Sequence, residues 1–138
     1  MSSKVTKKLT YLFLLMRLDK PIGIWLLMWP ILWSLWLASN GDVSIKILVI
    51  FMLGVVIMRS AGCVLNDFAD REIDPHVKRT KERPIASGKV SEKEALILFF
   101  ILMSLAFLLI FFLNRQTQIL ALIGACITAI YPFVKRIL

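Results

Sequence analysis

The sequence is poor in cysteine and histidine, and it contains no internal repeat and no low-complexity linker. Its two cysteines, Cys63 and Cys126, both lie in apolar runs without Cys or His partners at metal-binding spacing. Neither a disulfide framework nor a zinc site is therefore indicated, and both thiols are expected to be small packing residues. The single histidine, His76, is isolated and receives no catalytic assignment.

Charged residues are also scarce: they make up 19% of the 138 residues, whereas 59% are hydrophobic. Four long apolar runs exclude an ordinary soluble domain. The net charge of +8 is therefore not interpreted as a nucleic-acid-binding surface. The sequence predicts an all-α, multi-span bundle in the lipid bilayer, a single membrane domain over residues 1–138 with about four membrane helices. The expected spans cover about 20–38, 45–65, 95–113 and 118–134, with a motif loop at 66–94.

Local signals indicate where these helices begin and end. Pro21 stands where the first span can start, because proline is tolerated at the first helical position. Asp74 precedes Pro75, so the helix that continues the second span should end near there. Ser91 and Glu94 have the spacing of a capping box and should start the third helix.

The basic residues are distributed asymmetrically between the two ends of the spans. Fifteen lie in the N-terminal segment, in the region from Arg59 to Lys93 and after the fourth span, whereas only Lys46 and Arg115 lie in the two opposite turns. By the positive-inside rule, both termini and the motif loop are expected on the cytoplasmic side of a bacterial inner membrane. The first apolar segment should be retained, because bulky Trp36 occupies the −3 position of the only plausible signal-peptide cleavage site.

Seven of the nine acidic residues lie between Asn66 and Glu94. On a helix, Asn66, Asp70 and Asp74 would fall within about 80° of one another, and Asp67 extends the stripe. Carboxylates on one face repel each other, so a compensating partner is expected. Mg²⁺ is a suitable one, because it accepts one or two carboxylates together with substrate phosphates. We expect Asn66, Asp70 and Asp74 as metal ligands and Asp67 as a further, water-mediated candidate; a solvated surface helix is the alternative.

A basic run follows the acidic cluster and includes Lys78, Arg79 and Arg83. Arginine suits bidentate contacts with phosphate, and lysine acts as a mobile point charge. An acidic cluster followed by a basic one can hold a metal-bound diphosphate. The alternative is that these residues only set the membrane orientation.

Other polar residues near the ends of the spans are candidates for substrate contacts. Arg59 lies on the carboxylate stripe, which favours a position facing the bundle interior over snorkelling to the interface. Arg17 and Asp19 are either substrate contacts or an interfacial pair. Tyr131 and Lys135 lie one helical turn apart at the end of the fourth span, either in the site or as interface anchors.

The segment N-D-F-A-D-R-E-I-D, followed by K-R-T-K-E-R-P-I-A-S-G, resembles the first aspartate-rich motif of the UbiA superfamily of intramembrane prenyltransferases. Three further segments are similar to the branch that acts on 4-hydroxybenzoate: R-L-D-K-P-I-G with a following W-P, M-R-S-A-G-C, and Y-P-F-V-K-R. The haem-pathway and menaquinone-pathway branches share the aspartate motif, but they are less similar to this first span.

The resemblance implies an enzyme with about nine membrane helices around a cavity. It implies Mg²⁺-dependent transfer of a polyprenyl group from polyprenyl diphosphate to the ring carbon ortho to the hydroxyl of 4-hydroxybenzoate, in ubiquinone biosynthesis. On this basis the catalytic candidates are Asp70, Asp74, Tyr131 and Lys135. The substrate-binding candidates are Arg17, Asp19, Arg59, Lys78, Arg79 and Arg83, and the metal candidates are Asn66, Asp67, Asp70 and Asp74.

The sequence departs from the family pattern after Glu94, where no further acidic residue follows. The second aspartate motif of the family lies in later helices, so the sequence matches the N-terminal portion of the fold. We therefore expect no transfer by this chain alone, and a need for a complementary C-terminal fragment or self-association. Two other hypotheses are a non-catalytic membrane fragment and a small transporter; the apolar centres of the last two spans disfavour the transporter.

Overall fold

The computed structural model describes residues 2–137, and every regular element within that range is helical. The elements are α1 (Ser2–Leu15), α2 (Ile22–Ala38), α3 (Ile45–Ala69), the 3₁₀ helix η1 (Asp74–His76), α4 (Glu92–Ile110) and α5 (Arg115–Val134). Three of them, α3, α4 and α5, are long and apolar enough to cross a membrane, and α2 is a shorter apolar helix of 17 residues. The predicted all-α membrane bundle is confirmed.

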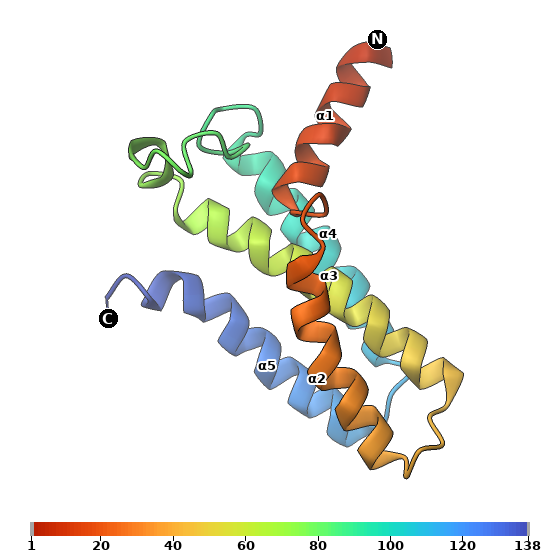
Figure 1. Ribbon diagram of the computed structural model, residues 1–138. Helices are drawn as coiled ribbons and strands as arrows, with labels where there is room; N and C mark the ends of the chain where they lie inside the picture. The colour runs from red at the N-terminus through yellow and green to blue at the C-terminus, as the bar shows by residue number, and fades with distance from the viewer. Residues whose placement is uncertain (1, 138) are drawn as a thin grey trace.

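Helix α3 is the centre of the arrangement, since it packs against each of the other four α-helices (Figure 1). The buried apolar cluster lies at the motif-loop end of α3 and includes Leu15 of α1, Val64 of α3, Val90 of the loop and Ala95 of α4. Burying a side chain such as Leu15 or Val64 stabilises the fold by about 1.5–3 kcal/mol. This cluster therefore ties the N-terminal helix and the motif loop to the bundle.

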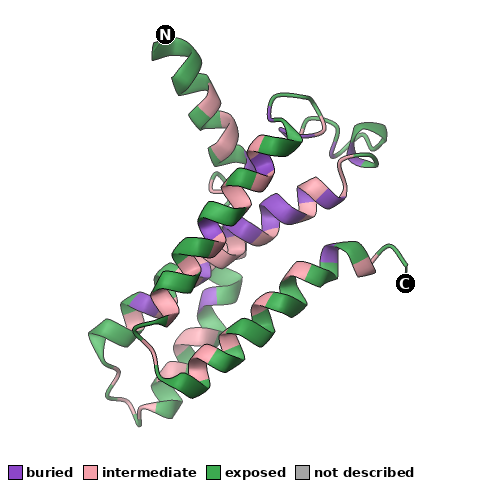
Figure 2. Cartoon of the chain, turned by 180° about the vertical axis from the view of Figure 1, so that it is seen from behind, coloured by how far each residue is buried: buried purple, intermediate pink, exposed green. Residues whose placement is uncertain are grey.

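Many large apolar side chains of α2, α4 and α5 are exposed. Among the described elements, α3 holds the largest share of the buried positions (Figure 2). The four tryptophans of α2 illustrate the pattern, with between 54% and 66% of each residue exposed. Apolar surface of this extent is unusual on a soluble monomer. It is the surface expected of helices that contact lipid, because their backbone polar groups are satisfied within each helix.

The structure confirms the predicted helix starts. Pro21 is the N-cap residue of α2. Ser91 caps α4 through a complete capping box, in which its Oγ accepts the Glu94 backbone N–H at 3.2 Å and its own N–H donates to Glu94 Oε2 at 2.8 Å. These hydrogen bonds satisfy backbone donors that a helix N-terminus otherwise leaves free.

The predicted continuous stripe of acidic residues along one helix is wrong at its end. Helix α3 ends at Ala69, Asp70 is its C-cap residue, and Asp74 begins the separate 3₁₀ helix η1. The reason is a tertiary contact: Asp74 forms an ion pair with Arg83 from the loop that follows, at 3.0 Å. A turn between Asp70 and Asp74 lets the chain reverse and bring Arg83 back over the end of α3.

Candidate functional site

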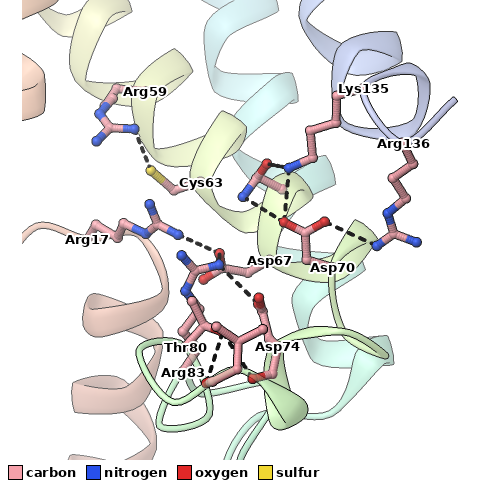
Figure 3. A network of polar contacts seen from close by, with 12 residues as sticks. Arg17, Arg59, Cys63, Asp67, Asp70, Asp74, Thr80, Arg83, Lys135 and Arg136 are labelled. Carbon is pink, nitrogen blue, oxygen red and sulfur yellow. Dashed lines mark hydrogen bonds and ion pairs between the residues drawn. The ribbon is translucent and has the colours of Figure 1, made fainter. Parts of the chain in front are cut away.

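Asp67 is the buried centre of the polar site at the end of α3, with only 1% of its surface exposed. Its Oδ1 accepts a hydrogen bond from Arg17 Nη2 at 2.6 Å and lies 3.1 Å from Arg83 Nη1. The same Arg83 nitrogen donates to Asp74 Oδ2 at 3.0 Å (Figure 3). Arg83 therefore bridges two carboxylates that are seven residues apart in the chain.

The two arginines reach Asp67 from different segments. Arg17 lies in the connection between α1 and α2 and has a φ of 55°, in the left-handed region that few residues other than glycine adopt. Arg83 lies in the motif loop, where Thr80 is buried and its Oγ1 donates to the Asp74 carbonyl oxygen at 3.0 Å. This side-chain hydrogen bond closes the turn that carries Arg83 back to α3.

A second group of contacts joins the end of α5 to the same motif. Asp70 Oδ2 accepts from Lys135 Nζ at 2.9 Å, and its Oδ1 accepts from Arg136 Nη2 at 3.1 Å (Figure 3). Lys135 Nζ also donates to Asn66 Oδ1, and Asn66 Nδ2 lies 3.4 Å from Asp70 Oδ2. The acidic motif is thus divided into two groups: Asp67 and Asp74 contact the arginines, whereas Asn66 and Asp70 contact the end of α5.

Arg59 lies about two helical turns before this motif on α3. Its Nη1 donates to Cys63 Sγ at 2.9 Å. Its guanidinium also packs over Gly23 of α2, where an added Cβ would lie only 2.3 Å from Arg59 Nη2. A glycine is therefore required at position 23 for Arg59 to occupy this place between α2 and α3.

Arg59 also lines a cavity of about 570 Å³ between α2, α3, α4 and α5. The other lining residues are predominantly apolar and include Leu27, Phe51, Met103 and Leu122. Among the described residues that line it, Arg59 is the only charged one. The cavity can therefore accept an extended hydrocarbon with one anionic or polar group near Arg59.

The structure does not bring all predicted site residues together. Asp19, Lys78 and Arg79 are exposed, and none of them forms an ion pair within residues 2–137. Tyr131 is 65% exposed on α5. The alternative in which Arg17 and Asp19 form an interfacial pair is not what the structure shows, because Arg17 turns toward the buried Asp67 instead.

Arg136 was not predicted as a site residue, although it contacts Asp70 as directly as Lys135 does. Cys63 was assigned only to packing, yet it accepts a hydrogen bond from Arg59. The sequence signal for Arg136 was its position next to Lys135. Its contact depends on where α5 lies relative to α3, which local patterns do not encode.

The proposed metal ligands have the right chemistry, because carboxylate and amide oxygens are what Mg²⁺ prefers. Their arrangement in this structure is different: within residues 2–137 no three Asp, Glu, His or Cys side chains lie close enough to hold a metal ion. Cationic side chains compensate the carboxylates instead. The donor set as arranged does not form a metal site, and the metal assignment remains a prediction.

The fold and the site define a helical membrane protein with an acidic and basic cluster beside an apolar cavity. Residues 27–138 match the UbiA prenyltransferase family, and the chain belongs to this family. Among its relatives, the 4-hydroxybenzoate octaprenyltransferase of Pseudomonas fluorescens (strain SBW25) is 56% identical over 122 residues, which cover 88% of this chain and 41% of the relative. The protein of the same name from Coxiella burnetii (strain RSA 493 / Nine Mile phase I) is 57% identical over 122 residues, 88% of this chain and 42% of the relative.

The chain therefore spans about two fifths of the length of these relatives. No solved structure matches it.

Proposed function

We propose that the protein to which this chain contributes transfers a polyprenyl group from polyprenyl diphosphate to 4-hydroxybenzoate, at the ring carbon ortho to the hydroxyl, in ubiquinone synthesis. The observation that carries this proposal is the pairing of a polar cluster with an apolar cavity along one helix, α3. A polyprenyl diphosphate has the same two-part character, a charged head and a long hydrocarbon tail. The names of the relatives supply the particular acceptor.

The cationic side chains of the site suit the diphosphate. Lys135 and Arg136 contact Asp70 from the surface, and their side chains remain 28% and 33% exposed. Both are long and flexible, so they can turn from Asp70 to phosphate oxygens when the donor binds. There they would stabilise the charge that builds on the departing diphosphate.

Magnesium remains part of the proposal because of the donor chemistry. Asn66, Asp70 and Asp74 would hold it, and it would neutralise diphosphate charge as a Lewis acid. Binding would require Asn66 and Asp70 to exchange their contacts with Lys135 and Arg136 for the metal, and Asp74, which pairs with Arg83, to turn toward them.

In the transfer itself, the bond between the allylic carbon and the diphosphate oxygen breaks, and the electron pair leaves with the diphosphate. The ring carbon ortho to the hydroxyl then forms a bond with the allylic carbon, and its proton is lost. The apolar cavity walls contribute by keeping water away from the allylic cation. Arg59, the charged residue of the cavity lining, is suited to hold the acceptor carboxylate.

The proposed function is tested in a full-length protein that carries this segment, such as a chimera in which it replaces the matching part of the Pseudomonas fluorescens relative. In lipid with Mg²⁺, polyprenyl diphosphate and 4-hydroxybenzoate, prenylated 4-hydroxybenzoate is the expected product. The 138-residue chain alone is expected to form none. Transfer only to a haem or to a naphthoate acceptor would contradict the assignment and favour another branch of the family.

The proposed orientation gives a separate prediction. The motif loop and the turn between α2 and α3 lie at opposite ends of the bundle (Figure 1). Ser87 in the motif loop and Asp42 in that turn are both exposed. On a background with Cys63→Ala and Cys126→Ala, a Ser87→Cys variant should be protected from an impermeant thiol reagent in intact cells, whereas Asp42→Cys should react. Both should react after the membrane is permeabilised, and the reverse pattern in intact cells would refute the orientation.

A further inference from the structure

We infer that Asp67 and Arg83 are positioning residues, whose ion pair fastens the motif loop to α3 and sets the place of Asp74 beside the diphosphate site. This inference rests on the proposed function for its catalytic consequence. Its structural part, the fastening of the loop, stands independently of the activity.

Burial is the first argument. Asp67 is 1% exposed, and both partners of its Oδ1 are guanidinium groups from other segments, at 2.6 Å from Arg17 and 3.1 Å from Arg83. A carboxylate enclosed in this way has little surface left for an incoming metal ion or phosphate. Removing one member of such a buried pair leaves an uncompensated charge, which is strongly destabilising.

The geometry of Arg83 is the second argument. A single nitrogen, Nη1, lies 3.1 Å from Asp67 Oδ1 and 3.0 Å from Asp74 Oδ2. Asp74 therefore uses one oxygen for Arg83, and its other oxygen has no hydrogen bond within residues 2–137. Arg83 thus fixes the orientation of Asp74, which is itself buried with 5% of its surface exposed, and holds it at the end of α3.

The segments that the ion pairs join are the third argument. Arg17 belongs to the α1–α2 connection, Asp67 to α3 and Arg83 to the motif loop, so one buried carboxylate joins three separate parts of the chain. The left-handed backbone at Arg17 belongs to a Schellman cap at the end of α1, in which the Arg17 N–H donates to the Leu14 carbonyl at 3.0 Å and the Leu18 N–H to the Phe13 carbonyl at 3.3 Å. The side chain of Arg17 reaches Asp67 from this cap. Among residues 2–137, the side chain of Asp70, by contrast, forms hydrogen bonds only with Lys135 and Arg136 at the end of α5 and with Asn66 one helical turn earlier.

The test is hydrogen exchange of the motif loop in the full-length protein in lipid nanodiscs. Asp67→Asn and Arg83→Gln should each speed the exchange of amides in residues 77–90 by about tenfold to a hundredfold, because each removes a charge-assisted hydrogen bond. The effect of the double variant should be smaller than the sum of the two single effects, since the two residues share one ion pair, although Asp67 also pairs with Arg17 and Arg83 with Asp74. Lys81→Gln, which removes one exposed charge from the same loop, should leave the exchange unchanged.

Kinetics separate this inference from direct substrate binding. Both variants should raise the KM for polyprenyl diphosphate, and Arg83→Lys, which keeps the charge, should recover part of the loss. If Arg83→Gln weakens donor binding while loop exchange stays at the wild-type rate, Arg83 contacts the diphosphate directly and the inference is wrong. Additive effects in the double variant would also overturn it.

Two further outcomes are distinguishable. If the wild-type protein shows no transfer, the proposed function fails, while the exchange rates still decide whether the loop is fastened by this pair. If Arg83→Gln also speeds exchange in the core of α3 and α4, that variant is misfolded and Arg83→Lys is compared with wild type instead. In Arg83→Lys the loop should exchange at an intermediate rate while the core stays protected. A wild-type loop rate in Arg83→Lys together with a raised donor KM would contradict the positioning role.

Discussion

Asp70→Ala is expected to lower turnover by about a hundredfold to a thousandfold in the full-length protein, with little loss of folded protein. This magnitude is that of removing one electrostatic group aimed at a reacting centre. Asp70 lies at the end of α3, where it contacts Lys135 and Arg136 on one side and Asn66 on the other. Without its charge, the proposed metal loses a ligand and the two cations lose the group that places them.

The matched control is Asp42→Ala, which removes an exposed carboxylate at the opposite end of the bundle and should leave turnover unchanged. The measurement is single-turnover transfer at saturating donor and acceptor, with Mg²⁺ varied. Asp70→Ala should also require more Mg²⁺ for its residual activity. Turnover within a few-fold of wild type would remove Asp70 from the site.

Arg59→Ala is expected to raise the acceptor KM by about tenfold to a hundredfold while changing the donor KM little. The range is that of a hydrogen bond to a charged group. Arg59 is a charged residue of the cavity lining, and within the described part of the chain the hydrogen bond of its side chain goes to the sulfur of Cys63. The guanidinium is therefore free to exchange this weak acceptor for a carboxylate. Initial rates with each substrate varied in turn provide the measurement.

Gly23→Ala provides a second test of the same guanidinium. Its new methyl group would lie 2.3 Å from Arg59 Nη2, so the flexible end of the arginine must shift. A smaller rise in acceptor KM is expected, with the protein still folded. Gly54→Ala is the control, because it adds a methyl group to the cavity wall with no atom within 4 Å. If Arg59→Ala raised the KM values of donor and acceptor equally, Arg59 would have a packing role and not an acceptor-binding one.

The acidic motif is divided into two groups of contacts, and this division changes the roles expected of Asp67 and Asp70. The sequence placed Asp67 at the margin of a metal site, whereas the structure makes it the most enclosed carboxylate of the motif. Neutralising Asp67 should therefore loosen the motif loop directly and slow the transfer reaction only as a consequence. Asp70, which is only partly buried, is better placed to exchange its cations for a ligand.

Much of the fold could be predicted from the sequence, because the relevant signals are local. Apolar runs of about 20 residues define membrane helices. Pro21 and the pair Ser91 and Glu94 determine helix starts through backbone geometry and hydrogen bonds that lie within four residues. The concentration of acidic residues after Asn66 likewise predicts the polar end of α3.

The pairing of charges within the site depended on the tertiary structure. Arg17 and Asp67 are 50 residues apart, and Lys135 and Asp70 are 65 residues apart, so no spacing rule connects them. The end of α3 at Ala69 has the same origin, since the loop must turn there for Arg83 to reach Asp67 and Asp74. The sequence determines which charged residues lie near the ends of the helices, because helix periodicity and hydropathy are local properties. Which cation neutralises which carboxylate follows only from how α1, α5 and the loop pack around α3.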